Sequence, residues 1–323
     1  MRFGAIGMAA VLALVSFGGA SGFGTISGLG QDREHERITR RALGCGASPE
    51  AACFEPGTLD ELAGKRRTWG AVGAPDNPAR GLLLSSEAHC DNGDWLPTPG
   101  YPHTQAAARA RLTGCRDGMK AHLDAAVRDA SGLVDAAGHV QGSQVPTLVD
   151  CAFDGAKGRA KCDVLEDLGL LLHASQDFYS HSNWADHAAP GLTALDNPEG
   201  LGHAGPAPWL DLRRTDPAFP AGLITGCFDK ISLVSPAKGC PGHVKHEDLN
   251  KDKGRIDPAI GAGTTNRGKV DGNFASAVQA AIADTRDKWA TLRERLVATY
   301  GPVRGARMIC AITHDDPART CGP

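Results

Sequence analysis

The sequence lacks an excess of positive charge. Its 323 residues contain 34 Lys and Arg against 37 Asp and Glu, which gives a formal net charge of -3. Proteins that hold nucleic acid over an extended surface carry a basic field on that surface. The composition excludes this mode of binding, so any contact with an anionic partner must be local.

The sequence also lacks a membrane-length apolar run. Its longest run, Ala5 to Phe17, follows the basic residue Arg2 and precedes small residues. This pattern predicts a secretory signal peptide over residues 1–20, cleaved near Ala20, and therefore a secreted, extracellular protein. The Gly- and Ser-rich residues 21–31 predict a flexible leader.

No Cys-x-x-Cys pair is present, so the ten cysteines fit zinc-thiolate sites poorly. In an exported chain they are expected to pair with one another. They fall into close couples that each bracket a loop containing Gly or Pro. We therefore predict five sequential disulfides: Cys45–Cys53, Cys90–Cys115, Cys151–Cys162, Cys227–Cys240 and Cys310–Cys321.

Long strand-like alternation and internal repeats are absent too, whereas apolar residues recur at helical spacing. The pattern predicts one mostly α domain over residues 32–323. We expect helices at 34–43, near 59–65, over 104–137 with breaks at Gly114 and Gly132, and from Asn273 to about residue 300. The proline-rich stretch 186–226 predicts a long loop that covers a site.

The most informative stretch is 170–184, in which His173, Asp177 and His181 follow one another at four-residue steps. On a helix these side chains share one stripe. The apolar residues around them leave the helix no polar side, so all three need partners in the interior. A divalent metal ion suits two imidazoles and a carboxylate. The alternative is a core helix whose His and Asp bond to protein neighbours.

Further ligand-type residues are spread along the chain. His35 lies in the first turn of a predicted helix, Asp76 lies between two prolines, and His89 precedes a cysteine. A dense group at 240–252 adds His243, His246 and Glu247. The same stretch contains Asp248, Asn250 and Asp252, whose spacing opens like a calcium loop but has its glycine one place late and lacks the closing acid. These departures argue against an EF-hand, while a looser Ca²⁺ site stays an alternative.

Together these positions resemble the zinc-dependent phospholipase C and fungal nuclease superfamily, and within it the Het-C (heterokaryon-incompatibility) type proteins. The phrase His-Ala-Ser-Gln-Asp-Phe-Tyr-Ser-His-Ser-Asn-Trp at 173–184 carries the resemblance. It implies a single-domain helical bundle with long disulfide-held loops and two or three Zn²⁺ ions. The implied ligands are His35, Asp76, His89, His173, Asp177, His181, His243, His246 and Glu247.

In that family a terminal residue's own backbone holds one zinc together with the first His, and the helical Asp bridges two zincs. The family also places a His six residues after this Asp, where this chain has Asn183, and His181 comes two residues sooner. No Trp begins the predicted mature chain.

The resemblance implies one of two functions. The first is a secreted phosphodiesterase of the phospholipase C type, acting on a phospholipid or a nucleic acid, with Asp76 as the proton acceptor. Phe178, Tyr179 and Trp184 are candidate walls of its entrance, with helix packing as their alternative role. The second is a Het-C-like cell-death or incompatibility factor that keeps the metals for structure and binds a partner or the membrane surface.

Overall fold

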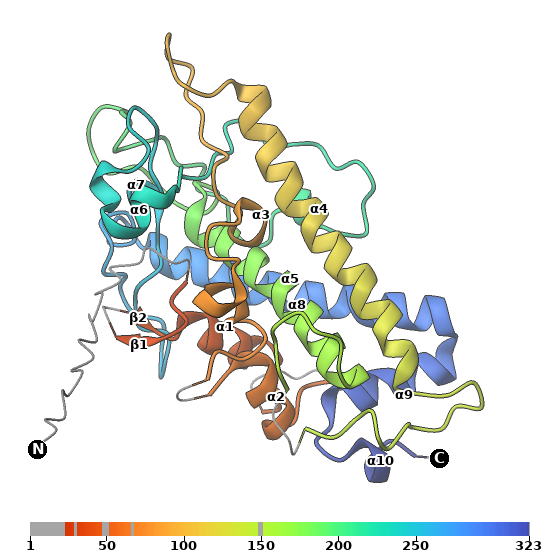
Figure 1. Ribbon diagram of the computed structural model, residues 1–323. Coiled ribbons are helices and arrows are strands. Elements are labelled where there is room, and N and C mark those ends of the chain that lie inside the picture. Colours follow the sequence, from red (N-terminus) through yellow and green to blue (C-terminus); the bar gives the residue numbers. More distant parts are fainter. Residues whose placement is uncertain (1–22, 29–30, 47–51, 66–67, 148–150, 323) are drawn as a thin grey trace, which may run out of the picture.

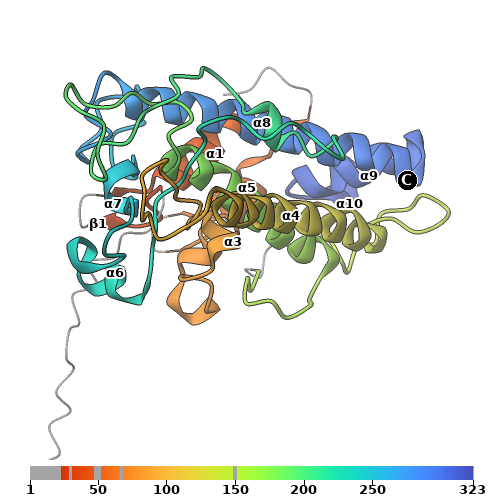
Figure 2. The ribbon, with the colours of Figure 1, turned by 90° about the horizontal axis from the view of Figure 1, so that it is seen from above.

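The computed structural model describes residues 23–28, 31–46, 52–65, 68–147 and 151–322 and is mostly α (Figure 1). The signal peptide predicted at 1–20 lies outside these residues. Figure 2 shows the long helix α5 passing behind α4, and both α4 and α8 contact it. The helices are α1 (Glu34–Leu43), α2 (Pro56–Ala63), α3 (Ser86–His89), α4 (Gln105–Asp129), α5 (Ala160–His181), α6 (Lys230–Val234), α7 (His246–Leu249), α8 (Asn273–Tyr300), α9 (Pro302–Thr313) and α10 (Pro317–Thr320).

Helix α5 is buried along its whole length, as the absence of a polar side predicts. Besides α4 and α8, the shorter helices α2, α3 and α9 contact it, so no face remains for solvent. Its polar residues have partners within the protein: the Ser175 hydroxyl donates to Asp284 at 2.6 Å, and the Gln176 amide donates to Thr39 at 3.0 Å. The helix is thus both the core of the fold and the carrier of the stripe formed by His173, Asp177 and His181.

Helix α4 differs from the prediction because it continues through Gly114 without a break. Glycine costs a helix only about 1 kcal/mol relative to alanine. Leu112, Met119 and Leu123 are buried on one side of α4, and this packing holds the helix together across the glycine. The predicted break at Gly132 coincides with a 3-10 turn at Ala130–Gly132, but the helix predicted to continue to residue 137 does not resume after it.

The described residues of the predicted leader are packed against the core, which corrects the expectation of a flexible segment. Phe23 is fully buried and contacts the ring of Phe274 at 6.3 Å between centroids. Strand β1 (Ser27–Gly28) pairs with β2 (Gln31–Asp32) in a short antiparallel hairpin. The composition of the segment is loop-like, but its one large apolar side chain anchors it.

The five predicted disulfides are confirmed in sequential order. This number of disulfides is typical of proteins exported to an oxidising compartment. Among the described residues, no helix has both the length and the apolar composition needed to cross a bilayer.

Lys161 at the start of α5 carries a buried amino group that predicts a pH effect. It is fully buried, and its ammonium donates to the hydroxyl of Thr58 at 3.0 Å and to the carbonyl of His314. Burial lowers its pKa to about 8 against the attraction of Asp315, Glu55 and Glu61. The folded protein therefore binds fewer protons than the unfolded chain from about pH 8 to 10.5, and stability rises with pH there.

We expect the free energy of unfolding of wild type, relative to Lys161→Met, to increase by about 2 kcal/mol between about pH 7 and 9.5. Urea unfolding of both proteins at the two pH values measures this difference. A constant difference would mean that Lys161 keeps an ordinary pKa in the folded state.

Candidate metal centre

The structure brings together the five residues predicted to form one cluster, although they span residues 35–177. His35, Asp76, His89, His173 and Asp177 are each at most 4% exposed. They come from α1, the 3-10 helix η1 (Ala74–Asp76), the end of α3, and α5. Each lies at a fixed point of the chain, such as the proline-bounded turn of η1 or the Cys90–Cys115 disulfide that follows His89.

A first metal-sized group consists of Asp76, His89 and His173, and one oxygen of Asp177 lies beside its two histidines. His89 Nδ1 and His173 Nε2 lie 2.9 and 3.1 Å from Asp177 Oδ2 and 3.0 Å from each other. Asp76 Oδ1 lies 4.0 Å from each of these two nitrogens. A tetrahedral zinc ion bound at about 2.0–2.1 Å separates its ligand atoms by about 3.3–3.4 Å. The observed distances lie on both sides of this value, so the group fits a zinc-sized ion.

Neighbouring groups direct these atoms inward. His173 Nδ1 lies 2.8 Å from the carbonyl oxygen of Val72, which can only accept a hydrogen bond. Nδ1 therefore carries the proton and donates, and Nε2 keeps its lone pair for a ligand. Asp76 accepts a hydrogen bond from the Thr25 hydroxyl at Oδ2, whereas its buried Oδ1 has no hydrogen-bond partner. A buried carboxylate oxygen without a donor is costly, and a cation would satisfy it.

A second group meets the other oxygen of Asp177. His35 Nε2 and the backbone nitrogen of Phe23 each lie 3.1 Å from Asp177 Oδ1. His35 Nδ1 lies 2.7 Å from Oε1 of Gln176, whose amide nitrogen donates to the hydroxyls of Thr39 and Thr285. This orientation makes His35 Nδ1 the donor and leaves its buried Nε2 without a hydrogen bond. The two oxygens of Asp177 therefore face different histidines: His35 lies beside Oδ1, and His89 and His173 lie beside Oδ2. A carboxylate that bridges two metal ions has this arrangement.

A third group contains His181 and differs from the predicted one. His181 and His246 direct Nδ1 to Asp91 Oδ1 at 3.1 and 3.2 Å. Their Nε2 atoms face Asp252 at 3.4 and 3.1 Å. All four side chains are at most 4% exposed. Two imidazoles between two carboxylates can hold either protons or a metal ion.

His243 and Glu247 do not join this third group, which corrects the ligand set that the resemblance implies. His243 contacts Asp94 instead, and Glu247 lies on the surface, 3.7 Å from the ammonium of Lys245. The third group is completed by Asp91 and Asp252, because the loop after α7 turns Asp252 inward against Ser180 of α5.

The suggested calcium ligands have separate partners. Asp248 accepts a hydrogen bond from the backbone nitrogen of Lys245 at 2.8 Å, whereas Asp252 faces the histidines of the third group. Asn250 Oδ1 is buried without a hydrogen-bond partner. These contacts give no calcium loop over 248–252.

The three aromatic residues predicted at an entrance have the packing role that we considered as the alternative. Phe178 and Tyr179 are fully buried and Trp184 is 5% exposed. Phe178 packs against Trp209 from the long loop 186–226, and the Tyr179 hydroxyl accepts a hydrogen bond from Ala207 of the same loop. The loop thus covers this end of α5.

The electrostatics of the cluster keep its carboxylates ionised. Burial opposes ionisation of Asp177, but His173, His181 and His35 outweigh it and hold its pKa well below the usual range. The pKa of Asp91 is lowered to about 2 by His181 and His246 despite its burial. Burial likewise opposes protonation of His246, yet Asp91 and Asp252 raise its pKa to about 9. Ionised carboxylates and neutral imidazoles are the states that bind metal, so an ion here would have to displace the proton that the raised pKa keeps on His246.

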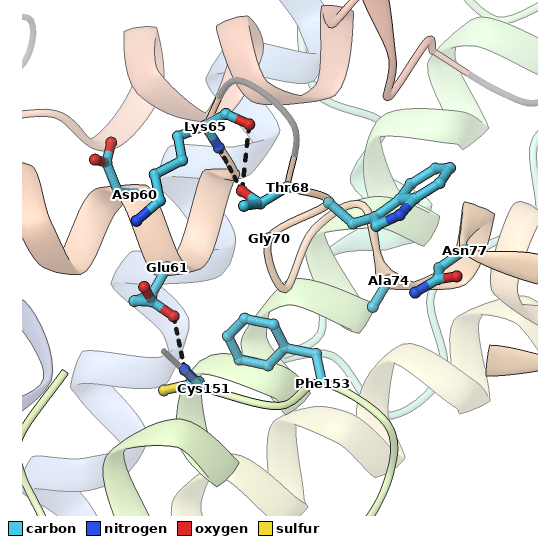
Figure 3. Close-up of a pocket in the computed structure, with 10 residues that line it drawn as sticks. Asp60, Glu61, Lys65, Thr68, Gly70, Ala74, Asn77, Cys151 and Phe153 are labelled. Atoms are coloured by element: carbon cyan, nitrogen blue, oxygen red, sulfur yellow. Dashed lines mark hydrogen bonds between the residues drawn. The ribbon is translucent and has the colours of Figure 1, made fainter. Parts of the chain in front are cut away.

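A surface pocket of about 330 Å³ lies beside the turn that carries Asp76 (Figure 3). Ala74 and Asn77, which flank Asp76 on either side, belong to its wall. Across the pocket, Phe153 lies beside Cys151, whose backbone nitrogen donates to Glu61 at 2.9 Å. No candidate metal ligand lines this pocket.

Sequence reasoning missed Asp91 and assigned Asp252 to a different ion. The position of Asp91, two residues after His89 and next to a disulfide, was the available signal. Comparison with known proteins gives no match: no family model, no curated protein and no solved structure is significantly similar to this chain.

Proposed function

We propose that this chain is a secreted metal-dependent phosphodiesterase of the phospholipase C type. The observation that supports the proposal most strongly is the environment of Asp177. This buried carboxylate faces His89 and His173 with one oxygen and His35 with the other. Such a residue would bridge two metal ions, and paired ions suit the hydrolysis of phosphate esters.

The charge of the cluster supports the same conclusion. Asp76, Asp91, Asp177 and Asp252 are at most 4% exposed. When ionised they carry four negative charges, which two divalent ions would neutralise. A third ion would leave a surplus of positive charge in a buried region, and an anionic phosphodiester would offset it.

Bound divalent ions would supply a water of lowered pKa and would offset the charge that develops on phosphate. Asp76 is the candidate proton acceptor, because its Oδ1 has no donor and its Oδ2 is held by Thr25. His173 is kept in one tautomer by Val72, and His35 by Gln176. These contacts hold the ligands in place before any substrate binds.

We further propose that the mature chain begins at Phe23. Its backbone nitrogen lies 3.1 Å from Asp177 Oδ1, on the same oxygen as His35. A free amino group there would be a metal ligand, whereas an amide would not. The preceding residues Ala20-Ser-Gly22 place small side chains at the positions that signal peptidase reads.

Intact-mass measurement of the secreted protein should therefore give a chain that starts at Phe23. A variant with two extra residues before Phe23 should hold one ion fewer than a variant extended at the C-terminus. A different first residue together with full metal content would contradict this assignment.

A second candidate function is the Het-C-like factor that binds a partner or a membrane and keeps the metals for structure. The burial of the predicted cluster ligands, each at most 4% exposed, favours this alternative, because structural metal sites are closed.

One experiment separates the two functions. Zinc content is measured by mass spectrometry, and the same sample is assayed with a soluble phosphocholine ester and with single-stranded DNA. Hydrolysis of either substrate, abolished by chelation and restored by Zn²⁺, would support the phosphodiesterase. Fully loaded protein that hydrolyses neither would favour the binding factor.

A further inference from the structure

A separate group of ligand-type side chains lies outside the central cluster. His243 Nδ1 is 2.7 Å from Asp94 Oδ2, and His103 Nδ1 is 3.1 Å from Asp94 Oδ1. The two imidazole rings stand edge to face, 4.7 Å apart between centroids. Asp94 is fully buried, whereas the side chains of His103 and His243 are 30% and 16% exposed. The group is therefore partly open to solvent.

Two atoms in this group lack the partners that burial requires. Asp94 Oδ1 and His103 Nδ1 are both buried without a hydrogen bond, although only 3.1 Å separates them. The other oxygen of Asp94 accepts a hydrogen bond from the Tyr101 hydroxyl at 2.5 Å, and that hydroxyl accepts one from the backbone nitrogen of Val244. Tyr101 thus holds the carboxylate in place while leaving Oδ1 directed at His103.

The backbone around the group is well supported. Asp94 lies three residues after Asp91, and His243 lies three residues before His246, so the same two segments carry both this group and the third central group. Residues 225–228 run between them: Asn92 donates to the carbonyl of Gly226, Cys227 to that of Val244, and His246 to that of Cys227, each at 2.9 Å. The Cys227–Cys240 disulfide closes the loop before His243.

We propose that Asp94, His103 and His243 form an additional binding site for a borderline divalent transition ion such as Zn²⁺, separate from the central cluster. Two imidazoles and one carboxylate are a ligand set that zinc uses in sites with a further open position. The partial exposure of the two imidazoles, 30% and 16%, places the group close to solvent. This inference does not depend on the proposed function.

A matched pair elsewhere in the chain shows what a plain hydrogen bond would look like. On the surface of α4, His122 Nδ1 lies 2.9 Å from Asp167, and the histidine side chain is 37% exposed. This pair resembles His103 and Asp94 in distance and exposure, but no second imidazole joins it among the metal-sized groups of the described residues. His122→Gln is therefore the control for loss of a histidine without loss of a metal site.

The experiment counts zinc ions at saturation in the full disulfide-bonded protein. Wild type, His103→Gln, His243→Gln and His122→Gln are equilibrated with Zn²⁺ alone and measured by mass spectrometry, with circular dichroism to check folding. We expect His103→Gln and His243→Gln each to hold one ion fewer than wild type and His122→Gln to hold the same number. Because His103 is the more exposed of the two ligands, its variant provides the test if His243→Gln does not fold.

Equal zinc content in wild type and folded His103→Gln would overturn the proposal, because the group would then be a hydrogen-bond network. A loss of more than one ion in the folded variants would also overturn it, since these residues would then support the central cluster instead of a separate site.

Discussion

Changing Asp177 to Asn should remove more than one metal ion per chain, because the substitution keeps the size of the side chain but removes the charge that both oxygens share. If the protein hydrolyses phosphodiesters, we expect at least about a 100-fold loss of activity, since even outer-shell partners of metal ligands cost 10–100-fold. The melting temperature should fall as well, because each ion at about 1,000 times its Kd adds about 4 kcal/mol to stability.

The control is Asp167→Asn, a change of the same kind on the same helix at a mostly buried carboxylate whose partner is the partly exposed His122. It should keep full metal content. Both proteins and wild type are melted with and without a strong chelator. A wild-type curve unmoved by chelation, in protein shown to be metal-loaded, would contradict the metal assignment. Asp177 would then be an ordinary core carboxylate, and its substitution would cost only about 1–3 kcal/mol.

Changing Gly169 to Ala should destabilise the fold by about 2–3 kcal/mol, because it overpacks a contact between backbones. A Cβ atom at Gly169 would lie 2.4 Å from the carbonyl carbon of Ala71. Val72 follows Ala71 in the chain, and its carbonyl accepts the hydrogen bond that orients His173. His173 lies one helical turn after Gly169 on α5. Displacement of the segment at Ala71 should therefore also weaken metal binding, through both His173 and Asp76.

Gly118→Ala on α4 is the matched control. The nearest atom to its added Cβ would be Glu87 Cβ at 3.7 Å, an ordinary contact. Alanine there should stabilise the protein by up to about 1 kcal/mol through helix propensity. Urea unfolding and zinc content of the two variants measure both effects. Equal stability of the two variants would show that the segment at Ala71 can move away without cost.

The features that were predicted correctly depend on residues close together in the chain. His173 and Asp177 share a stripe because helical spacing alone places them there. The cysteine couples are separated by 8 to 25 residues, so short loops bring them together. The mostly α class follows from the apolar periodicity of α8 and the apolar stretch of α5, which are local properties. The resemblance added His35, Asp76 and His89, which no local pattern could have joined to α5.

Features that involve contacts between distant segments were decided by the tertiary structure alone. Histidine and acidic residues are so close together around 243–252 that their spacing allows several sets of metal ligands. Only the path of the chain past Asp91 and Asp94 places His246 in the third group of the central cluster and His243 in the separate group. The burial of Phe23 beside Asp177 is a contact across 154 residues. The sequence by itself determined the stripe of His173, Asp177 and His181 on α5 and indicated the cysteine pairing, because local geometry specifies them. The remaining ligands, and the close approach at Gly169, needed the packed fold, because they depend on where distant segments meet.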